Sequence, residues 1–337
     1  METKLLSNST ADLQEAAHLL KEGNVVGIPT ETVYGLAADA RNPEAVRQIF
    51  AAKGRPADNP LIVHIAKLEE LESVAVSVPE LALKLAEKFW PGPLTMILPK
   101  HPSIPVITSG GLDTVGVRMP SHPVARKLIE LSGVPIAAPS ANISGYPSPT
   151  TAQHVMRDMH GKIAAVVDGG DCRVGVESTV IALEGEDSVR ILRPGYVTKE
   201  MLETVVPHVT LDKAILHQLQ EGQIVRSPGM KYQHYSPHAH VTLIEGRWPE
   251  FAAWVQQHAE AGTYALVFDG EGDDLSVPYL TYGTGDAEQA HQVFAKLREL
   301  DDIGAKRVFV RAPNPNGIGL AVYNRLIRAA GFEVIQV

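Results

Sequence analysis

Short apolar runs that alternate with amphipathic segments limit most strongly how this chain can fold. The apolar runs 25–28, 61–65 and 94–98 are bounded by polar residues, glycine or proline, as is typical of short buried strands. The segment 80–89 spaces its apolar residues as a helix does. Because strands and helices alternate irregularly up to about residue 206, we predict a mixed α/β domain over this part of the chain.

Local capping signals mark where several of these helices begin. Asn42 is followed directly by a proline, and this pair predicts a helix start because asparagine caps well and proline fits the first helical position. We expect Ser9 or Thr10 to cap the first helix. Ser121 is the expected cap of a later helix that ends at a glycine.

The last hundred residues have a more regular rhythm. Predicted strands and helices alternate there as in a small open parallel sheet of the Rossmann type: strands 240–245, 263–268, 306–310 and 332–336, and helices 248–260, 286–300 and 318–330. A chain of 337 residues is long for a single hydrophobic core. We therefore predict an N-terminal α/β domain over 1–206, a linker over 207–239 and a smaller α/β domain over 240–337.

The charge balance excludes one broad class of function. The sequence holds 30 Lys and Arg residues against 39 Asp and Glu residues, a net charge of −9, and both predicted domains are mildly acidic. Such a chain does not present a broad positive surface to nucleic acid. Anion binding must therefore come from a few cations gathered in a cleft.

Cysteine content and hydropathy indicate the compartment. Cys172 is the only cysteine, so no disulfide forms within the chain, and we expect it to be a buried apolar residue rather than a reactive thiol. The N-terminus lacks the apolar core of a signal peptide, and no stretch approaches the roughly 20 apolar residues that span a bilayer. We expect a cytoplasmic protein without membrane contact.

Polar groups follow several of the predicted strands and helices. Lys53-Gly54-Arg55 comes where a helix ends, and it suits either a polyphosphate or the negative end of the helix dipole. Ser140-Ala141-Asn142 follows a buried strand, where it either binds a small polar ligand or forms a turn.

Glu31 has two open roles: it could be a general base or metal carboxylate, or it could cap its own loop. His234, His238 and His240 do not have zinc-site spacing.

In their order along the chain these motifs carry a resemblance. The run PTETVYGL, KGRPADNPL, WPGPLT, TVGVRMP, APSANISGYPSPT, GVESTV, ILRPG and SPGMKYQHYSP, over roughly residues 25–238, resembles the threonylcarbamoyl-AMP synthases of the two-domain type. The run VYNRLIRAAGF near the end of the chain supports the same resemblance less strongly. The resemblance implies a YrdC-like mixed α/β catalytic domain with a twisted, largely buried sheet, followed by the smaller C-terminal domain.

The resemblance also implies a reaction. L-threonine, bicarbonate or CO2, and ATP would combine into threonylcarbamoyl-AMP, with release of pyrophosphate and water. A separate transferase would then move the threonylcarbamoyl group to tRNA, and contact of this chain with tRNA would be weak at most. Mg²⁺ would come bound to the phosphates, with no side chain of this chain assigned to it.

Site residues follow from the same resemblance. The groups expected to act on the nucleotide and in catalysis are Lys53, Arg55, Asn59, Thr114, Ser140, Asn142, Ser148, Arg193 and Tyr235. Those expected around threonine are Thr32, His64, Arg118, Ala138 and Ser178, with Arg118 on the carboxylate. A lid over the site is expected from the linker residues Lys231, Tyr232, His234 and Tyr235.

Two other functions stay open at this stage. One is an RNA-binding or ribosome-associated module without catalysis, although the acidic balance argues against tight, salt-sensitive RNA affinity. The other is a related adenylate-forming enzyme that uses carbamoyl phosphate.

Overall fold

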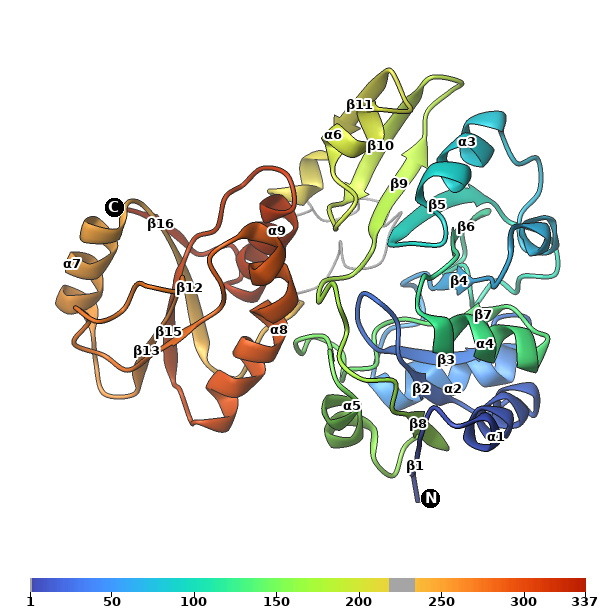
Figure 1. Ribbon diagram of the computed structural model, residues 1–337, viewed down its shortest axis with the longest axis horizontal. Helices are drawn as coiled ribbons and strands as arrows, with labels where there is room; N and C mark the ends of the chain where they lie inside the picture. The colour runs from blue at the N-terminus through green and yellow to red at the C-terminus, as the bar shows by residue number, and fades with distance from the viewer. Residues whose placement is uncertain (1, 218–233) are drawn as a thin grey trace.

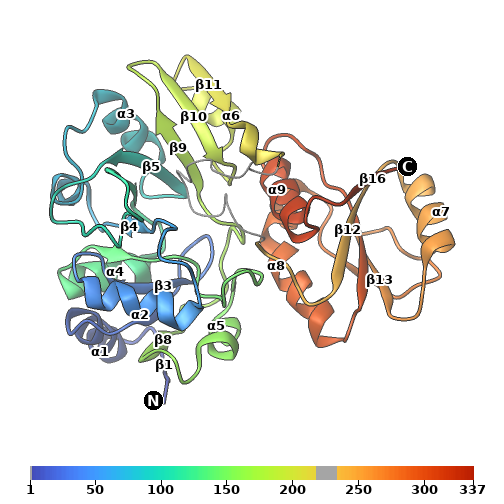
Figure 2. The ribbon, with the colours of Figure 1, turned by 180° about the vertical axis from the view of Figure 1, so that it is seen from behind.

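A computed structural model describes residues 2–217 and 234–337 of the chain. Two β-sheets organise it, one of eleven strands and one of five. Figures 1 and 2 show them in two lobes, with the helices α8 and α9 of the second lobe on the side that faces the first. The α/β class and the two-sheet organisation that the sequence predicts are thus confirmed.

The large sheet is mixed. Its strand order is β1-β8-β2-β3-β7-β4-β6-β5-β9-β10-β11, and both parallel and antiparallel neighbours occur in it. Most residues of its short strands are buried, so many of these strands appear in the sequence as nearly continuous apolar runs. The strands are β1 (Lys4–Leu6), β2 (Val26–Ile28), β3 (Gly35–Asp39), β4 (Ile62–His64), β5 (Leu94–Pro99), β6 (Thr114–Arg118), β7 (Ile136–Ala137), β8 (Ala165–Val167), β9 (Thr179–Leu183), β10 (Ser188–Arg193) and β11 (His208–Leu211).

The helix starts predicted at Ser9, Asn42 and Glu80 are confirmed, whereas the start predicted at Ser121 lies one residue too early. The side chain of Asn42 accepts hydrogen bonds from two backbone N–H groups of α2, and Ser9 caps α1 in the same way. The fourth helix follows His122 rather than the predicted cap Ser121, because Pro123 occupies its first position. The helices are α1 (Thr10–Lys21), α2 (Pro43–Lys53), α3 (Glu80–Phe89), α4 (Pro123–Ser132), α5 (Ala152–Met159) and α6 (Lys199–Glu203), with short 3-10 turns η1 (Leu68–Ser73) and η2 (Lys213–Ile215).

The second sheet is parallel, as predicted. Its order is β14-β13-β15-β12-β16, and every recorded pairing is parallel. Helices connect its consecutive strands except β13 and β14, which gives an open Rossmann-like sheet. The elements are β12 (His240–Glu245), α7 (Trp248–His258), β13 (Thr263–Val267), β14 (Tyr279–Thr281), α8 (Asp286–Asp302), β15 (Arg307–Arg311), α9 (Gly319–Ala329) and β16 (Val334–Gln336).

The first lobe extends further along the chain than the sequence suggests. Strand β11 pairs with β10 in parallel register, with Ser188 opposite His208, although it lies within the range 207–239 that we predict as a linker. The run 208–211 is short and half exposed, so hydropathy alone does not mark it as a strand. The described part of the linker is therefore shorter than predicted.

The two lobes share a buried interface. Val33, Val174 and Val176 of the first lobe belong to the same apolar cluster as residues of α8 and α9. Besides the exposed pair of Arg157 with Asp302, two ion pairs between described residues cross this interface: Arg298 with Asp158 and Arg325 with Glu177, each at 2.7 Å between nitrogen and oxygen. The side chains of Arg298 and Arg325 are almost fully buried. Because unpaired charges are costly to bury, these pairs tie the position of one lobe to the other.

Two further expectations from the sequence concern membrane-spanning helices and the single cysteine. Among the described residues, no helix combines the length and the apolar character needed to cross a membrane. Cys172 is buried, and burial raises the pKa of its thiol. A thiol in this setting stays protonated and unreactive at neutral pH, as predicted.

Candidate active site

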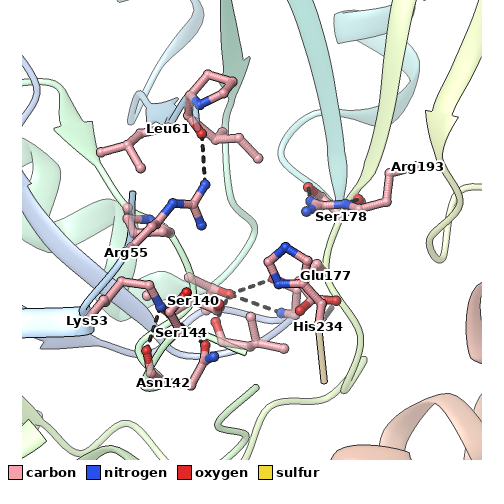
Figure 3. Close-up of a pocket in the computed structure, with 18 of the residues that line it drawn as sticks. Lys53, Arg55, Leu61, Ser140, Asn142, Ser144, Glu177, Ser178, Arg193 and His234 are labelled. Carbon is pink, nitrogen blue, oxygen red and sulfur yellow. Dashed lines mark hydrogen bonds between the residues drawn. The ribbon is translucent and has the colours of Figure 1, made fainter. Parts of the chain in front are cut away.

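A cavity of about 740 Å³, its open mouth included, lies among the strand ends of the first lobe. Figure 3 shows side chains from distant parts of the chain around this space, with Lys53, Arg55 and Asn142 opposite Ser178, Arg193 and His234.

The sheet brings these side chains together. Strands β4 and β6 pair in parallel, so their last residues, His64 and Arg118, stand side by side at one edge. Polar segments that follow β2 and β7 reach the same cavity. From the antiparallel pair β9 and β10, the residues before Thr179 and the last residue, Arg193, complete the wall. Because long stretches of sequence separate these strands, only their pairing makes the site.

Lys53 is the most buried cation of the cavity. Its ammonium donates to the backbone carbonyls of Ser140 and Asn142 at 2.5 and 2.6 Å, and it lies 3.4 Å from Asn142 Oδ1. Burial lowers the pKa of Lys53 strongly, and the neighbouring Arg55 lowers it further. Lys53 thus joins the end of α2 to the loop after β7, and its contacts are not the carbonyls of its own helix end. Of the two interpretations open for this motif, helix-dipole compensation does not describe its position.

Arg55 lies just past the helix end that Gly54 closes. Gly54 adopts the left-handed conformation with φ 64°, which glycine tolerates best. The chain therefore turns sharply, and the guanidinium of Arg55 reaches the cavity while donating to the carbonyl of Pro60 at 3.2 Å. The short Lys-Gly-Arg motif thus presents two cations on the same side of the cavity.

Arg118 is held on three sides. Its guanidinium donates to Thr32 Oγ1 at 3.0 Å and to the carbonyl of Gly92 at 3.3 Å, and it pairs with Glu31 at 2.6 Å. Burial acts to raise the pKa of Glu31, but the charge and hydrogen bond of Arg118 outweigh it and leave this pKa below its ordinary value. Glu31 itself does not line the cavity. It is therefore an ion-pair partner that orients Arg118.

Two histidines in the cavity are neutral. Burial and the nearby guanidinium of Arg118 lower the pKa of His64 to about 3. Burial and the charge of Arg55 lower that of His234 to about 3 as well. Within the described residues, His64 Nδ1 and His234 Nε2 have no hydrogen-bond partner. Both rings thus offer polar atoms to a ligand without adding charge.

Glu177, Ser178 and Arg193 form the opposite wall. Arg193 donates to the carbonyl of Ser178 at 3.1 Å and to its hydroxyl at 3.2 Å. Glu177 accepts hydrogen bonds from the hydroxyl of Ser148 and from Arg325. Burial acts to raise the pKa of Glu177, but Arg325 and Arg193 outweigh it, so this carboxylate stays ionised.

The charges of the cavity favour an anionic ligand. Among the described residues that line it, Lys53, Arg55, Arg118 and Arg193 are cations, and Glu177 is the one carboxylate. The described residues contain no group of three or more His, Cys, Asp or Glu side chains placed to hold a metal ion. An acidic protein therefore concentrates positive potential at this one cavity, where low-dielectric walls strengthen it.

Most predicted site residues line the cavity, and three do not. Thr32, His64, Ala138, Ser140, Asn142, Ser178 and Tyr235 line it together with the four cations. Thr114 lies at the opposite end of β6 from Arg118, Ser148 turns its hydroxyl to Glu177, and the side chain of Asn59 is buried outside the lining. For these three, position in a motif did not indicate where the side chain points. Of the predicted lid, His234 lines the cavity, whereas Lys231 and Tyr232 lie outside the described residues.

Two charged residues at this site were not predicted. Glu177 stands within the GVESTV motif, but no role was assigned to it. Arg325 lies on α9 in the other lobe, and its side chain is fully buried against Glu177. The run VYNRLIRAAGF that contains it was noted only as a cue to the family.

Comparison with known proteins shows to which family the chain belongs. The family model described as "Telomere recombination" matches residues 18–195, and the model described as "Threonylcarbamoyl-AMP synthase, C-terminal domain" matches residues 197–331. A threonylcarbamoyl-AMP synthase of Pyrococcus abyssi is 46% identical over 327 residues, covering 96% of this chain and 95% of the relative. The chain belongs to the threonylcarbamoyl-AMP synthase family. The resemblance seen in the sequence motifs is thereby confirmed.

Other members of this family extend the relationship. A threonylcarbamoyl-AMP synthase of Bacillus subtilis is 44% identical over 342 residues, covering 99% of this chain and 97% of the relative. A crystal structure of the Pyrococcus abyssi Sua5 protein complexed with L-threonine superposes with a TM-score of 0.94 at 43% identity, and each chain is covered completely. Both lobes therefore match this family member as a unit.

Proposed function

We propose that this chain makes threonylcarbamoyl-AMP from L-threonine, bicarbonate or CO2, and ATP, and releases pyrophosphate and water. One observation carries the proposal: the full-length match to a relative that binds L-threonine, in a chain whose own cavity is cationic and buried. A carboxylate-bearing amino acid and a triphosphate are both anionic, so both suit that cavity.

The proposed reaction requires the protein to position its substrates rather than to form a covalent bond with them. The amine of threonine attacks CO2 and loses a proton to give a carbamate; when bicarbonate is the source, its dehydration supplies the CO2 and the water. A carbamate oxygen then attacks the α-phosphorus of ATP, and the bond to pyrophosphate breaks. No protein nucleophile takes part, which fits a site whose nearby thiol, that of Cys172, is buried and protonated. The protein has to neutralise the phosphates and keep water from the carbamate.

The cations of the cavity have separate tasks in this proposal. Arg55 and Arg193 bind the triphosphate from opposite sides, and Lys53 keeps the Ser140–Asn142 loop in place while adding positive potential. Lys53 donates to carbonyls of the loop itself, so its part in the reaction is through that loop and its charge. The hydroxyl of Ser140 and the backbone of its loop bind the nucleotide.

Threonine binds at the edge where β4 and β6 end. Arg118 meets its carboxylate, and Thr32, which already accepts a hydrogen bond from Arg118, lies beside it. The free ring nitrogen of His64 and the backbone near Ala138 contact the remaining polar groups of threonine. The neutral state of His64 suits contact with an amine that has to lose its proton before it attacks CO2.

Magnesium enters with ATP in this scheme. Glu177, the carboxylate of the cavity lining, is already occupied by Arg325 and Ser148. The ion would therefore keep phosphate and water ligands, and it would reduce the charge of the triphosphate.

Omission of single substrates tests the function. We expect pyrophosphate release from ATP to require both L-threonine and bicarbonate, with threonylcarbamoyl-AMP detected by mass spectrometry. Release that depends on carbamoyl phosphate instead would overturn the substrate assignment. Salt-sensitive tRNA binding without any pyrophosphate release would favour the RNA-binding alternative.

The product also has a proposed destination. A carbamoyl-adenylate is an activated mixed anhydride that water destroys, so a second enzyme has to accept it soon after its release. We propose a separate transferase that places the threonylcarbamoyl group on tRNA in the cytoplasm.

A further inference from the structure

Helix α9 of the second lobe makes several hydrogen bonds to other parts of the chain through residues of its C-terminal half. Asn324 donates to the carbonyl of Ile215 at 2.6 Å, and Arg328 donates to that of Ala214 at 2.9 Å. The hydroxyl of Ser236 donates to the carbonyl of Ala329 at 3.2 Å. The helix therefore holds the chain both before and after the segment that connects the lobes.

Arg325 lies at the centre of these contacts. Its side chain is fully buried, and its guanidinium donates to Glu177 Oε2 at 2.7 Å and to the carbonyl of Pro194 at 3.1 Å. Asn324 Oδ1 accepts a further bond at 2.8 Å. Glu177 precedes β9 and Pro194 follows β10, so one guanidinium joins the two strand ends that carry the wall of the cavity.

Those strand ends bear the groups that face the ligand. Ser178 follows Glu177, and Arg193 precedes Pro194; their mutual hydrogen bonds set the direction of the Arg193 guanidinium. The two strand ends also approach too closely for another side chain, since a Cβ at Gly195 would lie 2.4 Å from the nitrogen of Thr179. A shift of either strand end would therefore move Arg193.

Arg325 also contacts Tyr235, another residue that lines the cavity. Its guanidinium lies 5.5 Å from the ring centre of Tyr235, which lines the cavity and packs on Phe294 of α8. A cation over an aromatic face in a buried setting is favourable. One side chain of the second lobe thus touches Glu177 and Tyr235, which line the cavity, and Pro194, which follows the lining residue Arg193.

We propose that Arg325 is a positioning residue for the triphosphate side of the active site, through which the second lobe completes a pocket otherwise built by the first. This rests on the proposed assignment of Arg193 to the triphosphate. Arg325 does not line the cavity and touches no substrate; it acts by fixing Glu177, Arg193 and Tyr235.

The chain offers a matched control. Arg298 on α8 is equally buried, pairs with Asp158 of the first lobe at 2.7 Å, and donates to a backbone carbonyl, that of Pro147, at 2.7 Å. Neither Asp158 nor Pro147 lines the cavity. Replacement of either arginine by lysine keeps the charge but loses the planar fork. Both variants should lose similar stability, and only one should disturb the site.

The experiment compares R325K and R298K in the full-length protein. Wild-type turnover is measured first, so that a failure of the proposed reaction is recognised before the variants are judged. We expect R325K to raise the KM for ATP about tenfold, the effect of misplacing one or two bonds to a charged group. We expect the dissociation constant for L-threonine, measured by calorimetry, to stay within about twofold. R298K should leave both constants within about twofold at a comparable loss of Tm.

A double-mutant cycle tests the route of the effect. If Arg325 acts through Glu177, the ATP effect of R325K will be much smaller in an E177Q background than in the wild type, because the two residues share one interaction. Equal ATP constants for R325K and R298K at matched Tm would overturn the proposal. A loss of threonine affinity in R325K as large as the loss of ATP affinity would overturn it too.

Discussion

At the residue scale, the cations of the site differ in their partners: some donate to neutral backbone carbonyls, and others pair with a carboxylate. Lys53 is surrounded by carbonyl oxygens, whereas Arg118 has Glu31 beside it. Carbonyl partners carry no opposite charge to balance that of the Lys53 ammonium, and burial lowers its pKa; an anionic ligand beside it would favour the charged form. Glu31 instead fixes the direction of Arg118, which leaves the guanidinium ready for a carboxylate.

The division of the site between its two substrates can be tested at Arg118. We expect Arg118→Lys to weaken L-threonine binding at least about tenfold, because the lysine ammonium cannot form the planar, two-pronged contact with a carboxylate. ATP affinity should change by no more than about threefold. Isothermal titration with each substrate measures both constants, while the retained positive charge keeps Glu31 paired.

Arg193→Lys is the reciprocal control for this division. It should weaken ATP binding and leave threonine binding nearly unchanged. Normal threonine affinity together with lost ATP affinity in the Arg118 variant would show that Arg118 and Arg193 have been assigned to the wrong substrates.

At the element scale, the packing of α8 on the first lobe depends on a glycine. Gly175 has φ +85°, and a Cβ there would lie 2.4 Å from the carbonyl oxygen of Ala290 on α8. The loop and the helix backbone thus approach closely just before Glu177. An added methyl group has no space unless α8 moves, and α8 carries Phe294 and Arg298 into the interface.

Alanine at Gly175 should therefore separate two physical effects. Gly170 has the same φ of +85° but nothing within 4 Å of its Cβ position, so Gly170→Ala should cost only the backbone strain, about 1 kcal/mol. Gly175→Ala should cost about 1–3 kcal/mol more in free energy of unfolding because the helix has to shift. Urea denaturation of both variants measures the difference. Equal losses would mean that α8 accommodates the methyl group without strain.

At the scale of the whole molecule, the buried cationic cavity links stability to pH. The pKa values of His64 and His234 lie at about 3, below the ordinary value near 6.5 that these groups regain on unfolding. The unfolded chain thus binds protons below pH 6.5 that the folded chain does not. The stability that this neutral state contributes is present above pH 6.5 and is lost as the pH falls toward 3.

This linkage predicts a measurable loss of stability in mild acid. Between pH 7 and pH 5 each of the two histidines should reduce the free energy of unfolding by about 2 kcal/mol. Urea titrations at the two pH values measure it. In His64→Gln the loss should shrink by about that amount, whereas Gln at the exposed His160 should leave it unchanged. An undiminished loss in the His64 variant would contradict the buried, neutral state of this ring.

Much of the local structure was predictable because its causes lie close together in the sequence. Asn42 caps α2 through bonds to residues two and three positions ahead, and α3 follows directly from its apolar spacing. Strands β3 and β14 were not predicted. β3 comes directly after a polar loop, and β14 has only three residues, none of them fully buried, so neither gives a clear local pattern.

The sequence by itself thus determined the α/β class, most element positions and, through the order of its motifs, the family. Only the tertiary structure decided which of those motif residues share a cavity. It brings Lys53 to a loop 87 residues away and turns Ser148 and Thr114 elsewhere. It also decided that Arg298 and Arg325, which look like surface positions on amphipathic helices, are buried against carboxylates of the other lobe. Helix and turn signals act between near neighbours, whereas pairing of distant strands and the docking of two lobes depend on contacts that no local pattern encodes.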